Sequence, residues 1–304
     1  MNFHCKLLQN GLVLAVCLVV SATTLCGQWA DEILAHSLKL RSEVCLETEN
    51  WDSASSYLTD AASRYKRTES WESWVDAVNA AGESLGKAER TDENRAMLEE
   101  AIKKGIALWG ENNVRVADSY ETLGAWHFAV AKKGDSAIFY LRKGLSSRIA
   151  ARGRNQPKVG ASLELLGDIY QEFSMFEPSL ASYMEALEVY HAVESPDSLQ
   201  IAACHDNIGM ALWFNAEYLK AYEHLLESHA IRTALLPLQD PLIGESESNL
   251  GHILRFIGKP ELAMEHHKIS RDIMVAHYGE NHVNVARSYN GMAILMMDKA
   301  DFSQ

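Results

Sequence analysis

The sequence predicts an all-α solenoid of about six helix pairs followed by one unpaired helix, and three regularities carry this prediction. An apolar residue followed by a small one recurs every 42 residues, at Leu166-Gly167, Ile208-Gly209, Leu250-Gly251 and Met292-Ala293. Two further ladders hold only small residues, namely Ala137, Ser179, Ala221, Ala263 and Gly144, Ala186, Ser228, Ser270. All six prolines fall in first turns or in links between helices. A fixed period of 20–50 residues is typical of solenoids.

The small residues indicate where helices touch. Ala137 and Gly144 are seven apart, about two helical turns, so they share one helix face. A glycine inside a helix costs about 1 kcal/mol relative to alanine. Its repetition at one register is explained by close helix contact, and we assign these glycines no chemistry.

In the first third of the chain, helical periodicity without breakers predicts four helices, over residues 31–48, 51–65, 71–85 and 94–109. Ala54 and Ala61 are again seven apart, and Gly82 lies 42 residues before Gly124. Gly110 stands where a helix is expected to stop.

The later elements are pairs of helices, predicted over 114–132 with 135–151, 159–173 with 178–193, 199–215 with 217–235, and 242–257 with 260–278. Pro178 and Pro260 stand in first turns, where a missing N–H costs nothing. The other four prolines are assigned to links: Pro157, Pro196, Pro237 and Pro241. The last helix, over 283–297, has no partner before Gln304, so we expect a further domain or another cover for its apolar face.

Residues 1–27 predict a secretory signal peptide. Lys6 is followed by ten apolar residues, 11–20, which are too few to span a bilayer. Cleavage is expected after Ala22 or Gly27. The mature segment is therefore expected to be exported, to a bacterial periplasm or cell envelope, with no membrane span.

The formal net charge of −13 argues against nucleic acid and anionic membranes as partners. Three of the five cysteines lie in the leader, and Cys45 and Cys204 are about four repeats apart, so no disulfide is predicted. Cys204 shares a register with three serines, Ser162, Ser246 and Ser288, which favours a small packing residue over a nucleophile.

Two segments match each other, WGENNVRVADSY over 109–120 and YGENHVNVARSY over 278–289. Both resemble the link of tetratricopeptide repeats of the kinesin light chain type, G-x-x-H-P-x-V-A-x-S-Y, with Val283 in place of the proline. Residues 166–170 (LGDIY) match the L-G-x-x-Y of the first helix, and Ala221 and Ala263 match the alanine that opens the second. A 42-residue period also fits HEAT and armadillo repeats. The resemblance divides the chain into divergent repeats over 28–110 and an array over 111–304 with an incomplete last repeat.

The resemblance implies a right-handed superhelix that binds peptides or proteins. The expected function is a non-enzymatic interaction scaffold. The alternative is a sensing or regulatory fragment of a larger protein, because similar exported arrays precede CHAT-type proteases or membrane-spanning signal transducers.

Family geometry implies a concave wall formed by three first-helix registers, located three residues before, one after and four after the glycine. The candidate binding residues taken from this wall and its neighbours are Glu164, Asp168, Gln171, Asp206, Asn207, Trp213, Asn249, His252 and Arg255. Related arrays use asparagines to hold a peptide backbone, and Trp and Arg are favoured anchors. We expect a protein or peptide segment that carries basic residues, and the alternative for each residue is a solvated helix face.

No metal or cofactor is predicted. The late histidines are His252, His266, His267, His277 and His282. Neighbours such as His266 and His267 point about 100° apart on a helix, which does not suit one metal ion. No catalytic or nucleotide-binding motif is present, so no enzyme activity is predicted.

Overall fold

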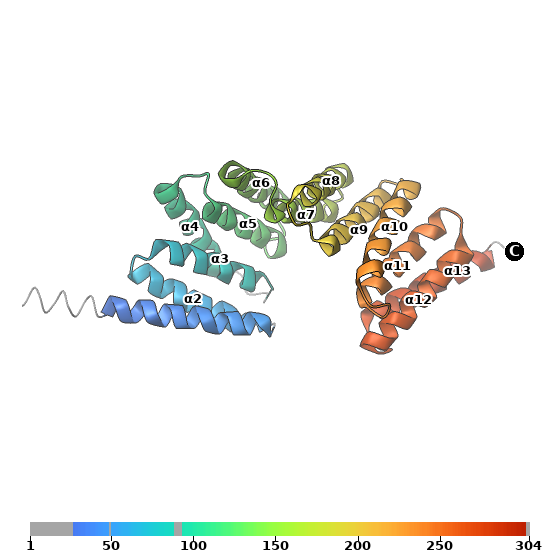
Figure 1. The fold of residues 1–304 in the computed structure, drawn as a ribbon, viewed down its shortest axis with the longest axis horizontal. Helices are drawn as coiled ribbons and strands as arrows, with labels where there is room; N and C mark the ends of the chain where they lie inside the picture. Colours follow the sequence, from blue (N-terminus) through green and yellow to red (C-terminus); the bar gives the residue numbers. More distant parts are fainter. Residues whose placement is uncertain (1–26, 49, 88–92, 302–304) are drawn as a thin grey trace, which may run out of the picture. The chain divides into compact units, whose positions relative to one another are not determined.

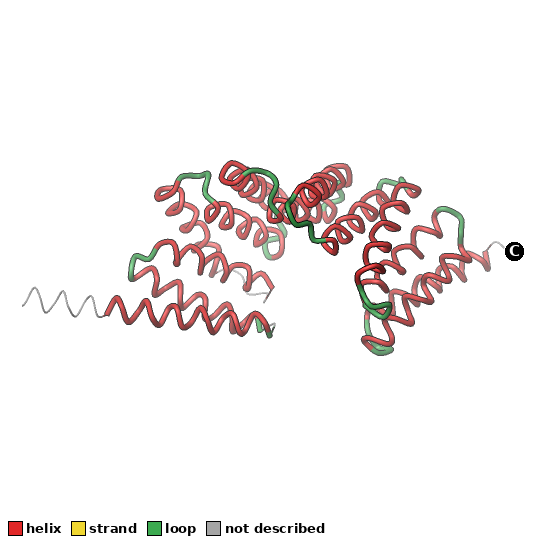
Figure 2. The backbone as a smooth tube through the Cα atoms, viewed as in Figure 1, coloured by secondary structure: helices red, strands yellow, loops and turns green. Residues whose placement is uncertain are grey.

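The computed structural model describes residues 27–48, 50–87 and 93–301 of the chain. Within these ranges helices alternate with short loops and no strand occurs, as Figure 2 shows. No helix in them is long and apolar enough to cross a membrane. The predicted leader lies almost wholly outside the described ranges, so the signal peptide and export stay predictions.

The first of two compact units ends at Ala151. It holds a helix over residues 27–47 and then α2 (Trp51–Arg67), α3 (Trp71–Lys87), α4 (Glu93–Trp109), α5 (Val114–Ala129) and α6 (Gly134–Arg152) (Figure 1). α2 packs along α3, and α5 contacts both α3 and α4. Trp74, Leu98 and Leu123 lie in the buried core of this unit.

The second unit begins at Arg152. Its helices are α7 (Pro157–Glu172), α8 (Phe176–Ala192), α9 (Ser198–Phe214), α10 (Tyr218–Leu235), α11 (Pro241–Phe256), α12 (Pro260–Tyr278) and α13 (Val283–Asp301) (Figure 1). α7 packs most extensively on α8, α9 on α10, and α11 on α12. Successive pairs are joined by contacts of α8 with α9 and of α10 with α11. The last helix, α13, packs on α12 and α11. The three helix pairs predicted in this unit and the final helix are thereby confirmed.

Three first helices begin with the same kind of cap, and four turns between paired helices share one backbone conformation. Asn113, Asp197 and Asp240 cap α5, α9 and α11, each accepting a hydrogen bond from a backbone N–H of the first turn. The turn to the second helix uses a left-handed residue at one register, Lys132, Ser174, Ala216 and Gly258, with φ of 51°, 56°, 59° and 76°. The left-handed Lys132 explains why α5 ends before the predicted Lys132.

Two prolines assigned to links stand inside helices. Pro157 and Pro241 are the first residues of α7 and α11. The first helical position needs no N–H donor, and the fixed φ of proline suits it. The linking loops are therefore shorter than the sequence pattern predicted.

The glycine ladder marks the closest helix contacts, as predicted. A second-helix side chain lies over each first-helix glycine: Leu141 over Gly124, Tyr183 over Gly167, Leu225 over Gly209 and His267 over Gly251. A Cβ added at these glycines would come within 2.8, 2.5, 2.8 and 2.8 Å of that side chain. The small residues opposite, Ala137, Ser179, Ala221 and Ala263, are fully buried.

Candidate binding face

Glu164 and Asp206, two of the residues predicted on the concave wall, are buried. Glu164 and Asp206 are 9% and 8% exposed. Tyr190 Oη and Gln200 Nε2 each donate to Glu164 Oε2 at 2.5 Å. Arg232 Nη1 lies 2.6 Å from Asp206 Oδ2. Both carboxylates are thus engaged within the array.

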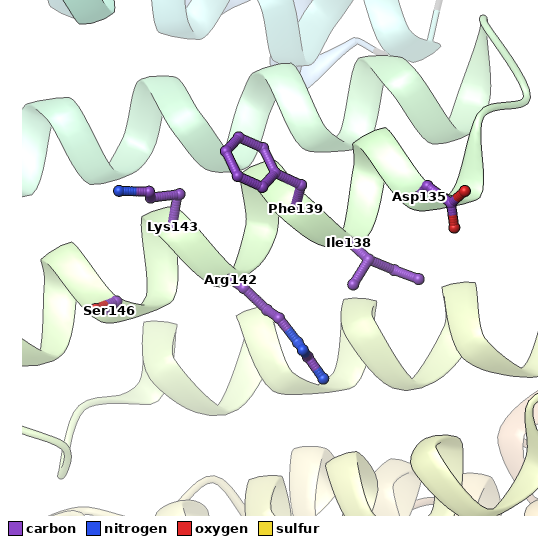
Figure 3. Close-up of a pocket in the computed structure, with 6 residues that line it drawn as sticks. All are labelled: Asp135, Ile138, Phe139, Arg142, Lys143 and Ser146. Atoms are coloured by element: carbon purple, nitrogen blue, oxygen red, sulfur yellow. The ribbon is translucent and has the colours of Figure 1, made fainter.

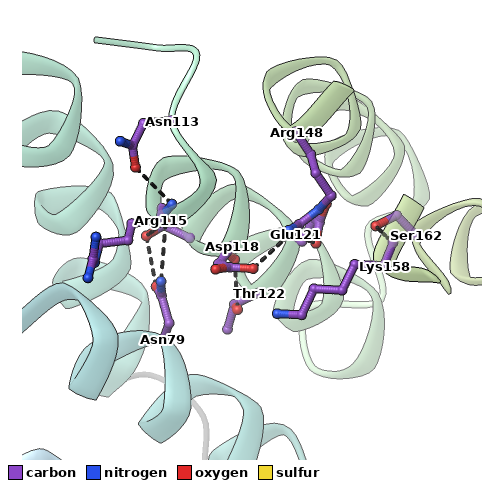
Figure 4. Close-up of polar contacts among 10 residues, drawn as sticks. Asn79, Asn113, Arg115, Asp118, Glu121, Thr122, Arg148, Lys158 and Ser162 are labelled. Atoms are coloured by element: carbon purple, nitrogen blue, oxygen red, sulfur yellow. Dashed lines mark hydrogen bonds and ion pairs between the residues drawn. The ribbon is translucent and has the colours of Figure 1, made fainter. Parts of the chain in front are cut away.

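Tyr190 and Arg232 share one register of the second helices, 42 residues apart, and Arg148 holds the same register one repeat earlier. The next member of the register is Met274, which has no hydrogen-bond donor. In the first unit, Arg148 pairs with Glu121 at 2.6 Å and Asp118 at 2.7 Å, as Figure 4 shows. Sequence reasoning missed this ladder, although the recurrence of Arg148 and Arg232 two periods apart was a usable signal.

Burial dominates the ionisation of these groups. It raises the pKa of Glu164, against the hydrogen bonds from Tyr190 and Gln200, which lower it. Burial likewise raises the pKa of Asp206, while the Arg232 guanidinium opposes that rise. A charged carboxylate at either position therefore depends on its donor.

Asn207 directly follows Asp206 on α9, and Asn249 holds the equivalent position on α11. Both side chains are only partly buried. They are 42 residues apart, at the same place in successive repeats. In the described part of the chain, neither side-chain amide makes a hydrogen bond within the protein. Each therefore offers both a donor and an acceptor to a bound molecule.

Asp168 and Gln171 lie on α7. Asp168 is exposed and accepts a hydrogen bond from Tyr183 Oη at 2.7 Å, while Gln171 is partly buried. No cation is paired with Asp168 among the described residues, and its surroundings raise the pKa of its carboxyl, against the hydrogen bond from Tyr183.

Trp213 belongs to a row of aromatic rings. Its ring lies 5.0 Å from Phe214 and 5.6 Å from Phe256, while Phe176 stacks on Phe214 and Tyr218 on Phe256, both at 5.0 Å. Phe214 and Phe256 are 45% and 40% exposed. Beside this row, a hollow of about 690 Å³ is lined in part by Tyr218, Leu219 and Phe256.

His252 and Arg255 are both partly buried on α11. The ring of His252 packs edge to face on His267, with 4.7 Å between the ring centroids. Burial lowers the pKa of His252, and the positive charges of Arg287 and Arg255 lower it further. Arg255 makes two hydrogen bonds to Asp298 of α13, at 2.5 and 3.1 Å. The structure thus packs His252 against His267 and pairs Arg255 with α13.

A second hollow, of about 460 Å³, lies on α6 of the first unit (Figure 3). Its described lining comes from α6 alone: Asp135, Ile138, Phe139, Arg142, Lys143 and Ser146. Lys143 is bound to Glu111 at 2.8 Å. None of the predicted binding residues lies there.

The described residues contain no group of three or more His, Cys, Asp or Glu arranged to hold a metal ion. Cys204 is buried and donates to the Tyr183 carbonyl at 3.2 Å. Burial raises the pKa of its thiol to about 12, so a thiolate nucleophile is disfavoured. The packing interpretation of Cys204 fits this environment.

Known proteins that resemble the chain in sequence or structure contain helical repeats of the same kind. Protein KINESIN LIGHT CHAIN-RELATED 1 of Arabidopsis thaliana is 24% identical over 212 residues, 70% of this chain. The nearly identical TPR-like repeats of Podosopora anserina, assigned to a kinesin light chain, align with a TM-score of 0.59, 16% identity and coverage of 67% of this chain and 96% of theirs. The chain has the fold of a tetratricopeptide-repeat solenoid. No family model matches it.

Two further solved structures resemble the chain. The apo form of RapI aligns with a TM-score of 0.69 and 16% identity, over 89% of this chain and 73% of RapI. A Rap protein complexed with Competence and Sporulation Factor aligns with a TM-score of 0.55 and 14% identity, over 88% and 72% of the two chains. The chain spans about a third of the length of the Arabidopsis relative. Likeness at this level establishes the fold, which is typical of protein-interaction scaffolds.

Proposed function

We propose that the chain binds an extended peptide or protein segment on a binding face formed by Asp168, Asn207, Trp213, Asn249 and His252. These residues lie on α7, α9 and α11 of the second unit. The observation that carries the proposal is the pair of partly buried asparagine amides without hydrogen bonds inside the described chain, one repeat apart. An extended backbone presents an N–H and a C=O at each residue, and these match both halves of an amide side chain.

Charge and shape refine the proposed partner. Asp168 is the exposed acidic member of the face, because Glu164 and Asp206 are buried in internal contacts. A basic residue of the segment is therefore expected near Asp168, with an apolar side chain near Trp213. Support by analogy comes from the Rap protein that was solved with Competence and Sporulation Factor.

The context of binding is a second part of the proposal. The apolar residues 11–20 favour export, so we place binding in a bacterial periplasm or envelope. Amino-terminal sequencing of the protein from cell fractions tests this, and an intact leader on cytoplasmic protein would contradict it. A role as the regulatory part of a longer protein is compatible with the same face.

Replacing both asparagines, Asn207→Ala with Asn249→Ala, is expected to weaken peptide binding by about 10-fold or more. Each lost hydrogen bond contributes about 0.5–1.5 kcal/mol. The probe is a set of peptides selected against the native chain from a phage-displayed random library, with affinity measured by fluorescence anisotropy.

The matched control is Glu223→Ala with Lys268→Ala, two exposed residues on second helices away from the binding face. This variant should bind as the native chain does, and circular dichroism should show equal helix content in all three proteins. Selected peptides that bind the asparagine variant with native affinity would refute the proposed face.

A further inference from the structure

His267 is the exception in the ladder of side chains that cover the glycines. The equivalent residues of the preceding repeats are Leu141, Tyr183 and Leu225, and His267 is as deeply buried, at 1% exposure. It also lies over a second glycine, Gly291 of α13, where an added Cβ would come 2.5 Å from its Nε2. His267 is thus held between α11 and α13.

Gly291 fits this arrangement. It occupies the register of Asn207 and Asn249, 42 residues on from Asn249. A side chain at position 291 would collide with the imidazole, so the missing side chain makes room for His267. The docking of α13 therefore depends on the ring of His267.

The surroundings of His267 suit only a neutral ring. Its Nδ1 is buried without a hydrogen-bond partner, and its ring packs edge to face on His252. The other charged or titratable groups around the pair are Arg255 of α11, Arg287 of α13 and His266 of its own helix. The nearby carboxylate of Glu247 already accepts from His266 Nδ1 at 2.5 Å, and Asp298 is bound to Arg255.

We infer that His267 makes the docking of α13 on α11 and α12 acid-sensitive, so that protonation of this ring releases α13. This deepens the proposed function, on which its consequence rests: α13 borders the binding face through Arg287 beside His252 and Asp298 on Arg255. Release of α13 would uncover Arg255 and loosen His252, changing how the face holds a segment.

The direction of the effect follows from the ionisation of the ring. Burial, with His252 and His266, lowers the pKa of His267 from 6.5 to about 4. Release of α13 uncovers the side of the ring that faces Gly291 and moves the pKa of His267 back toward its ordinary value of 6.5. The stabilisation of the docked state is therefore complete above pH 6.5 and is lost as the pH falls toward 4.

Hydrogen–deuterium exchange of the whole chain without ligand, followed by mass spectrometry, tests the inference. Between pH near 7 and near 4.5, and after correction for intrinsic exchange, opening of α13 is expected to increase roughly 10- to 60-fold. Peptides from α8 should change far less. Because no ligand is used, failure of this result and failure of peptide binding are distinguishable.

The matched variant is His267→Leu, which carries the residue of two sibling repeats, with His267→Tyr as a second variant that copies Tyr183. Either should reduce the acid effect on α13 to about 3-fold or less. Equal protection of native α13 at both pH values would overturn the inference, and so would an undiminished acid effect in a folded variant.

Discussion

Replacing Arg232 by methionine is expected to lower the free energy of unfolding by about 3–5 kcal/mol. Arg232 is 5% exposed and also donates to Ser246 Oγ at 2.7 Å and to the Leu242 carbonyl at 3.1 Å. Its removal leaves the Asp206 carboxylate, 8% exposed, without a cation. An unpaired buried charge is among the most destabilising changes that a single substitution can make.

The chain itself offers the matched rescue. One period later the same two registers hold Ser248 and Met274, both buried. The double variant Asp206→Ser with Arg232→Met copies that pair, and we expect it to recover most of the lost stability. Urea unfolding followed by circular dichroism measures all three proteins. A double variant as unstable as Arg232→Met alone would show that the ion pair does not account for the loss.

Replacing Gly209 by leucine is expected to destabilise the chain by about 1–3 kcal/mol. A Cβ at this position would lie 2.8 Å from Leu225 Cγ and 3.2 Å from the Ala221 carbonyl oxygen. The second contact is with backbone, so α9 and α10 would have to separate. Thermal unfolding measures the effect against Glu223→Leu, an exposed control on α10 that should change stability by less than about 0.5 kcal/mol. Equal melting temperatures for native chain and Gly209→Leu would contradict the assigned contact.

The fold could be predicted because the same close contact between paired helices recurs in each repeat and requires a small residue. Gly167, Gly209 and Gly251 must lie under a large side chain of the partner helix, and that constraint repeats with the chain. Pro178 and Pro260 indicated helix starts for an equally local reason, since the first turn tolerates a missing donor. Such constraints act on residue types at a fixed spacing, so they can be detected in the sequence alone.

The candidate site was predicted less completely because the side chains that bind its residues differ from one repeat to the next. Glu164 and Asp206 share a register, but one is engaged by Tyr190 and the other by Arg232, so spacing alone did not show that both are buried. Arg255 is paired with Asp298, 43 residues away on the next first helix, which only the packing of α13 reveals. The aromatic row around Trp213 likewise joins residues from several helices.

The most direct test of the binding face is site-specific photo-crosslinking. Met210 lies on α9 near Asn207 and is partly exposed, whereas Glu223 is exposed on α10. Each is replaced in turn by p-benzoylphenylalanine, and the chain is irradiated with a selected peptide. A bound segment on the proposed face predicts crosslinks from position 210 at least about 10-fold above those from position 223, and their loss in the Asn207→Ala, Asn249→Ala background. Equal yields from both positions, or a yield that survives the asparagine substitutions, would contradict the central claim.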